Sequence, residues 1–212
     1  RVGTGNASRR HFDSNRNWQA IHPQGFLPEF HPTVKDYSGT GGLRTQVSGW
    51  ALDFGGSYGL NTFDYDMRNT LNPSLGPCLD VACAPGPDGI LGNADDPGIP
   101  NQTSFFAGRL RRSEYEGGAN ASKAVSIGLP APLNVAVGVL LRGENYQIPK
   151  GELASYVNGG AQAQDGSGAA PIGSSGFGGF RPEDASNHSR TNFGSFADLE
   201  TNLSPAFLVN VA

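Results

Sequence analysis

The stretch Leu133-Asn134-Val135-Ala136-Val137-Gly138-Val139-Leu140-Leu141-Arg142 decides the fold class of this 212-residue chain. Apolar side chains occupy every second position from Leu133 to Leu141, and smaller or polar residues fill most of the positions between them. A period of two is the pattern of a β-strand with two different faces. The stretch therefore predicts a long strand, running from Leu133 to about Tyr146.

The same alternation recurs along the chain. We expect further strands at residues 42–54, 57–69, 105–128 and 191–203, the end of one strand at 1–13 and the start of a seventh at 207–212. Gly55-Gly56, the segment Leu129–Pro132 and Ser204-Pro205 predict tight turns. Long loops are expected over residues 14–40, 70–104 and 149–187.

Short turns and long loops thus alternate along the chain. This asymmetry is typical of bacterial outer-membrane β-barrels, whose periplasmic turns are short and whose extracellular loops are long. We predict an all-β fold: an antiparallel transmembrane β-barrel segment of about six or seven strands from a larger barrel. One domain is expected over residues 1–212.

Composition excludes some classes of protein. The net charge of −4 argues against a nucleic-acid partner, and no apolar run is long enough for a transmembrane helix. The 31 Gly and 15 Pro residues fit a β-protein with long polar loops.

Alternation alone does not say what covers the apolar face. In a soluble β-sandwich it meets a second sheet, and in a membrane barrel it meets lipid. Apolar stretches of about nine to eleven residues, with charged segments beyond them, favour the barrel. Four aromatic residues near the ends of these stretches suit an interfacial girdle: Trp50, Tyr58, Tyr115 and Phe193.

The ends of the sequence suggest a piece of a longer protein. Arg1 follows no start methionine, and Ala212 ends an alternating run. The alternative is a complete small β-domain.

Several segments resemble TonB-dependent outer-membrane receptors. They occur in the order expected for that family and are spread over nearly the whole chain. The segments are Gly25–Glu29, Tyr58–Phe63 with Asn69–Asn72, Arg142–Ile148 with Gly151–Tyr156, Phe180–Asp184, and Ser189–Phe193 with Ala197–Glu200.

The resemblance implies part of a receptor in the outer membrane of a Gram-negative bacterium, which takes up a scarce nutrient through a plugged 22-stranded barrel. Implied partners are outer-membrane lipid, a small-molecule nutrient bound by the extracellular loops, and the TonB complex, acting through a plug region. The sequence shows no plug-like segment, and its strands are too few to close such a barrel. The nutrient class (siderophore, cobalamin or carbohydrate) stays open.

The sequence offers few candidate catalytic, metal-binding or disulfide-forming residues. Cys78 and Cys83 are expected to form a structural disulfide, the alternative being a metal pair. The run Pro87–Asp96 has oxygen ligands for calcium but lacks the spacing of an EF-hand, so a turn cluster is the alternative. The four histidines are scattered, and the glycine-rich residues 159–179 lack a phosphate-loop ending. We therefore expect no enzyme, catalytic residue, cofactor or metal site.

Charged side chains on the polar face of the strands are expected to form ion-pair ladders along the barrel wall. They are Glu114, Glu116, Arg142, Glu144, Asp198 and Glu200. Two other functions remain open: a passive porin-like or adhesin barrel, and a soluble β-sandwich binding module. A passive channel would keep its uptake when TonB is absent, and a sandwich would be soluble without detergent.

Overall fold

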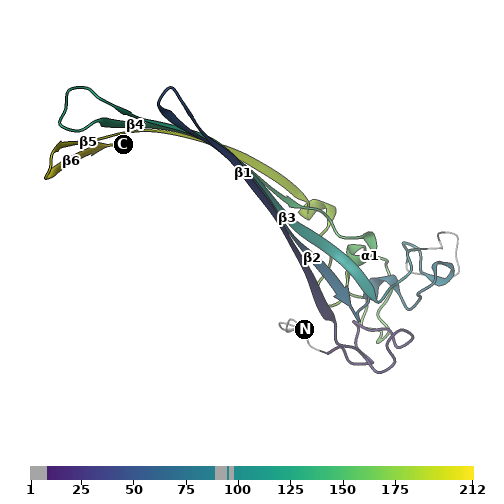
Figure 1. The fold of residues 1–212 in the computed structure, drawn as a ribbon. Helices are drawn as coiled ribbons and strands as arrows, with labels where there is room; N and C mark the ends of the chain where they lie inside the picture. Colours follow the sequence, from purple (N-terminus) through teal and green to yellow (C-terminus); the bar gives the residue numbers. More distant parts are fainter. Residues whose placement is uncertain (1–8, 89–94, 96–97) are drawn as a thin grey trace. The chain divides into compact units, whose positions relative to one another are not determined.

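Six β-strands follow one another in a single antiparallel sheet in the order β1-β2-β3-β4-β5-β6 (Figure 1). The computed structural model describes residues 9–88, 95 and 98–212. The strands are β1 (Glu29–Val47), β2 (Trp50–Arg68), β3 (Ser104–Val125), β4 (Leu133–Ile148), β5 (Ser186–Ser204) and β6 (Phe207–Val211). Within the described residues the sheet is an open meander: it is not closed into a barrel.

Helices are short and confined to the connections. They are η1 (Pro73–Leu75), η2 (Val81–Cys83), α1 (Leu153–Tyr156) and η3 (Pro182–Asp184). Among the described residues, no helix combines the length and the apolar composition needed to cross a membrane.

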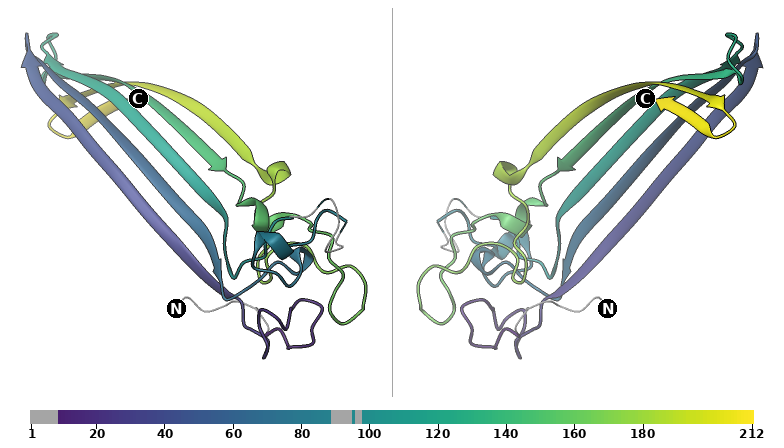
Figure 2. Two further views of the ribbon diagram at one scale, coloured as in Figure 1. Left: turned by 90° about the vertical axis from the view of Figure 1, so that its right-hand side faces the viewer. Right: turned by 90° about the vertical axis from the view of Figure 1, so that its left-hand side faces the viewer.

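The chain divides into two compact units. The loop unit comprises Arg1–Lys35, Thr62–Arg111 and Gln147–Asn187, and it contains the long connections. The hairpin unit comprises Asp36–Asn61, Arg112–Tyr146 and His188–Ala212, and it contains the short ones. Strands β1 to β5 each contribute a segment to both units (Figure 2).

The predicted alternation of short and long connections is confirmed. Two residues join β1 to β2 and two join β5 to β6, and residues 126–132 join β3 to β4. Residues 69–103 and 149–185 form the long connections. The fold class is therefore all-β, as the alternation predicted.

The predicted turn at Gly55-Gly56 is wrong, because the chain reverses at Ser48-Gly49. Both turn residues have positive φ, 51° for Ser48 and 80° for Gly49. Two consecutive positive φ values are the signature of the hairpin turn whose twist matches that of the flanking strands. Gly55 and Gly56 lie inside β2, where a Cβ on Gly56 would come within 3.2 Å of the Glu116 carbonyl oxygen.

Two expectations for the first forty residues also fail. Residues 29–40, expected in a loop, belong to β1, an edge strand that accommodates Pro32. Of the strand expected at 1–13, residues 1–8 lie outside the described residues. Residues 9–13 contain only an isolated bridge between Arg10 and Phe26.

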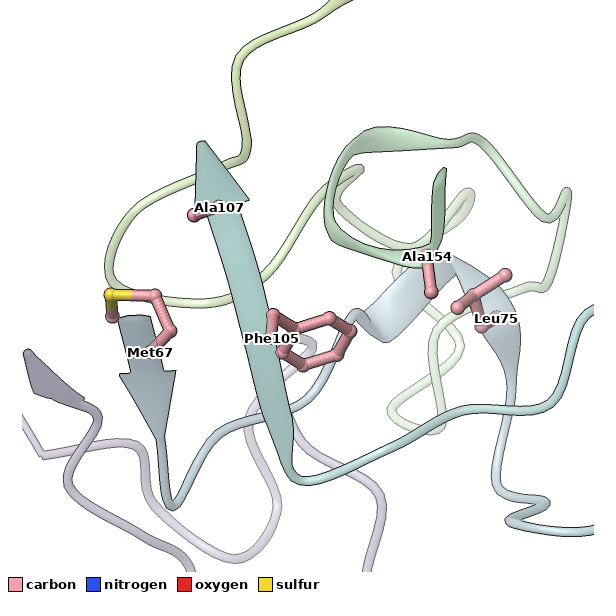
Figure 3. Packing of buried hydrophobic residues seen from close by; sticks show 5 residues of the cluster. All are labelled: Met67, Leu75, Phe105, Ala107 and Ala154. Carbon is pink, nitrogen blue, oxygen red and sulfur yellow. The ribbon is translucent and has the colours of Figure 1, made fainter. Parts of the chain in front are cut away.

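The long connections pack on each other around a small apolar core. It contains Met67 of β2, Phe105 and Ala107 of β3, Leu75 of η1 and Ala154 of α1 (Figure 3). An aromatic cluster adjoins it, in which Tyr65 stacks on Phe177 at 5.0 Å between ring centroids. The Phe180 ring occupies the space in which Gly108 lacks a side chain.

A buried amide network holds these connections together. Asn72 is fully buried, and its Nδ2 donates to the carbonyl oxygens of Ala154 and Val157, each at 2.9 Å. The side-chain oxygen of Asn72 accepts from Ser74 and from the amide of Gly173. Asn101 bonds the backbone of Asn72 from the other side, in both directions. Because these bonds satisfy every polar atom of the Asn72 side chain, the loops have a fixed internal geometry.

We expect Gly49→Ala to lower the free energy of unfolding by about 1–2 kcal/mol, because a side chain is strained at positive φ. Gly55→Ala is the matched control, since a Cβ there would lie 4.0 Å from the Gly41 carbonyl oxygen, an ordinary van der Waals distance. Urea denaturation of both variants checks the turn. A larger loss in Gly55→Ala would contradict the observed register.

Candidate functional site

The strand segments of the hairpin unit have two chemically different faces. Along β1, Tyr37, Leu43 and Val47 alternate with Asp36 and other polar residues. Contacts between strands assign the polar side chains to one face: Asn61 donates to Asp36, and Arg44 pairs with Asp53 at 2.7 Å. The intervening positions therefore define an opposite, apolar face.

The apolar face is continuous over β1 to β5 and exposed. Phe193 is 71% exposed, Leu43 63% and Tyr37 60%. Other large exposed side chains on this face are Val47, Phe54, Tyr58, Tyr115, Val137, Val139, Leu141, Leu199 and Leu203. Large exposed apolar surfaces of this kind mark places where proteins contact partners or membranes.

Two of the aromatic residues expected in an interfacial girdle, Trp50 and Tyr115, lie on the apolar face; the girdle itself stays a prediction. The Lys123 ammonium lies 5.8 Å from the centroid of the Trp50 ring and donates to the Ser48 carbonyl oxygen at 2.9 Å. The Tyr115 ring covers Gly143 on the neighbouring strand, where any side chain would collide with it. Lys123, which interrupts the apolar row in the sequence, thus directs its charge toward the turn.

The opposite face carries a ladder of charged residues across β3, β4 and β5. Glu144 accepts from Arg112 at 2.7 Å, from Arg142 at 3.3 Å and from Arg190 at 2.5 Å. Glu114 accepts from Arg112 at 3.1 Å and from Arg142 at 2.8 Å. Three guanidiniums share two carboxylates, so the ladder, defined by these five residues, has a net charge of +1.

Three of the six predicted ladder residues are in this network: Glu114, Arg142 and Glu144. Asp198 instead accepts a hydrogen bond from Asn210 at 2.7 Å. Glu116 and Glu200 make no ion pair within the described part of the chain. Arg112 and Arg190 were missed as members, although the alternation places them on the polar face.

Small residues on the polar face accommodate the few large ones. Gly138 leaves room for the Phe196 ring and for the side chain of Asn120. An open pocket of 580 Å³ lies beside Phe196, with Arg44, Asp53, Asn120 and Ser122 among its lining residues. A second, of 510 Å³, is lined by residues that include Asp36, Asn61, Arg112 and Glu114. Both pockets are open to solvent and have charged and amide side chains in their lining.

The cysteines predicted to pair, Cys78 and Cys83, are joined by a disulfide with their Cα atoms 5.7 Å apart. It closes a short loop around η2, whose first turn is capped by the Asp80 side chain. Of the run from Pro87 to Asp96, residues 89–94 and 96 lie outside the described residues. In the part that the structure describes, no three His, Cys, Asp or Glu side chains form a metal-binding group.

Several residues of the segments that resemble TonB-dependent receptors make specific contacts in the structure. Phe180 packs on Tyr65, and Glu152 accepts from the amide of Phe106 at 2.9 Å. Asn72 is the centre of the amide network, and Glu144 is the centre of the charged ladder. Comparison of the chain with protein-family models, curated proteins and solved structures finds no match.

Replacing Glu144 by Gln removes the carboxylate that three guanidiniums share, and Arg112, Arg142 and Arg190 then repel one another. We expect a lower urea midpoint than for Glu200→Gln, which removes a carboxylate without an ion pair in the described structure. The midpoint of Glu144→Gln should rise when salt screens the repulsion. Equal midpoints for the two variants would show that the ladder does not stabilise the sheet.

Proposed function

We propose that the strands of the hairpin unit form part of the wall of an outer-membrane β-barrel. The observation that carries this proposal is the exposed apolar face of a sheet whose other face bears a charged ladder. In such a wall the apolar face contacts lipid and the charged face lines an aqueous lumen. A soluble β-sandwich would bury the apolar face under a second sheet, and no described residues supply one.

Strand length supports the proposal. Strands β1 and β2 have 19 residues each and β3 has 22, whereas a strand in a soluble protein usually has about 5–6. A tilted strand needs about 9–11 residues to cross the hydrocarbon core, so these strands also extend beyond it. In β2 the alternation changes phase in the extension: odd positions are small or polar up to Asn61 but carry Phe63, Tyr65 and Met67 beyond it.

The lengths of the connections predict the orientation of the proposed wall in the membrane. In outer-membrane barrels the short turns face the periplasm and the long loops face outward. We infer that Ser48-Gly49, residues 126–132 and Pro205-Ala206 are periplasmic. The packed connections of the loop unit would then be extracellular, where a disulfide such as Cys78–Cys83 is stable.

The open sheet indicates a larger barrel. Strands β1 and β6 are the sheet edges, and an unpaired backbone edge is not tolerated in lipid. In the proposed wall further strands would pair with these edges, and residues 1–212 would be a partial barrel domain. The resemblance of the segments described above favours a TonB-dependent receptor for uptake of a scarce nutrient, with no enzymatic activity. Its partners would be outer-membrane lipid, the nutrient and, through a plug region, the TonB complex.

Single cysteines on the two faces test the wall. Ser38 and Ser195 are both exposed serines in strands, Ser38 on the polar face and Ser195 on the apolar face. In cells that produce the protein, a hydrophilic maleimide should label Ser38→Cys and leave Ser195→Cys unlabelled, because lipid excludes the reagent. The native disulfide does not react and can stay in place.

Two further positions test the orientation. Ser167→Cys in a long connection should label in intact cells, whereas Ser48→Cys should label only after the outer membrane is permeabilised. Equal labelling of Ser38→Cys and Ser195→Cys would contradict the wall and support the soluble alternative.

A further inference from the structure

The loop unit contains a small polar pocket of 170 Å³. Two arginines line it, Arg10 and Arg16, together with Pro73 and the segment Pro171–Gly178. Pockets for whole drug-sized ligands have about 300–1,000 Å³, so this one has room for a single functional group of a ligand.

The two guanidiniums make the pocket electropositive. Partial burial and the nearby charge of Arg16 both lower the pKa of Arg10 from its usual value, burial having the larger effect. Arg16 makes no ion pair within the described residues. A positive potential at a small pocket attracts anions.

The geometry of the pocket is fixed by bonds from its walls. Arg10 Nε donates to Ser175 Oγ at 3.0 Å, which aligns the guanidinium. The amides of Gly173, Ser174 and Ser175 donate to Asn72 Oδ1, to the Ser155 carbonyl oxygen and to the Leu71 carbonyl oxygen. The lining segment is therefore anchored to the amide network around Asn72 and does not need to fold around a ligand.

The same segment offers backbone donors. In the described part of the chain, the amides of Gly176, Phe177 and Gly178 have no hydrogen-bond acceptor. Consecutive free amides in a glycine-rich loop form concave anion sites, and guanidiniums bind carboxylate and phosphate oxygens through paired hydrogen bonds. The two arginines and the residues that carry these amides line one pocket.

We propose that this pocket binds an oxyanion group, a carboxylate or phosphate, with Arg10 and Arg16 as its charged donors and the amides of Gly176–Gly178 as neutral ones. The proposal goes beyond the barrel wall and does not depend on it, because every residue of the pocket belongs to the loop unit. The group can belong to a free small molecule or to a lipid headgroup, since both present the same oxygens.

Calorimetric titration of the purified protein in neutral detergent tests the site. The probes are inorganic phosphate, citrate, and micelles that carry phosphatidic acid. We expect saturable binding of at least one probe, with a Kd below about 1 mM at low salt. Binding of phosphate or citrate would identify a soluble ligand, and binding of the micelles alone would identify a lipid headgroup at the same pocket.

Three variants separate the pocket from a general effect of charge. Arg16→Gln should weaken binding about tenfold and Arg16→Lys less, because a charge-assisted bond is partly restored. Arg9→Gln is the matched control: Arg9 does not line the pocket, and it donates to the Gln24 carbonyl oxygen. Trp18, whose Nε1 donates to the Pro73 carbonyl oxygen at 2.8 Å, reports by its fluorescence that the loops stay folded.

No saturable binding of any probe would overturn the proposal. Equal weakening by Arg9→Gln and Arg16→Gln in folded variants would also overturn it, because binding would then follow net charge alone. Labelling of Ser38→Cys and Ser195→Cys is unaffected by either outcome, so failure here and failure of the barrel wall are distinguishable.

Discussion

The main physical constraint on this structure is that the two faces of the sheet in the hairpin unit need different surroundings. Burial of apolar surface away from water contributes about 25 cal/mol per Å², so the face bearing Tyr37, Leu43 and Phe193 is costly in water. The opposite face bears Glu144 and three arginines, which are costly in hydrocarbon. The proposed wall between lipid and water would satisfy both faces at once, whereas water on both sides leaves the apolar face exposed.

The loop unit is stabilised by different interactions. Its apolar core is small, and buried amides connect its long loops where a larger domain would use apolar packing. Asn72 alone bridges η1, α1 and the segment that contains Gly173. A fixed loop geometry of this kind lets Arg10 and the glycine-rich segment present donors without first becoming ordered, which lowers the entropic cost of binding.

The sequence alone predicts the strands where alternation is strong, as in β4 and β5, and it fails where local signals compete. The Gly55-Gly56 pair is a good turn signal, but Ser48-Gly49 is favoured by pairing across the hairpin. That register places Arg44 beside Asp53 and Asp36 beside Asn61. The opposite charges of Arg44 and Asp53 were the available signal. The roles of Asn72 and Arg190 depend on contacts between segments far apart in the chain, which alternation does not encode.

Fluorescence quenching by brominated lipids tests the central claim most directly, because the chain has only two tryptophans. Trp50 lies on the apolar face near the Ser48-Gly49 turn, and Trp18 lies in the loop unit, hydrogen-bonded to the Pro73 carbonyl oxygen. In bilayers with bromine near the headgroup end of the acyl chains, the fluorescence of the Trp18→Phe variant should be strongly quenched, because its remaining tryptophan is Trp50. The fluorescence of Trp50→Phe, whose remaining tryptophan is Trp18, should be quenched little. Equal quenching of the two, or strong quenching of Trp50 by aqueous iodide with none by lipid, would contradict a lipid-facing sheet.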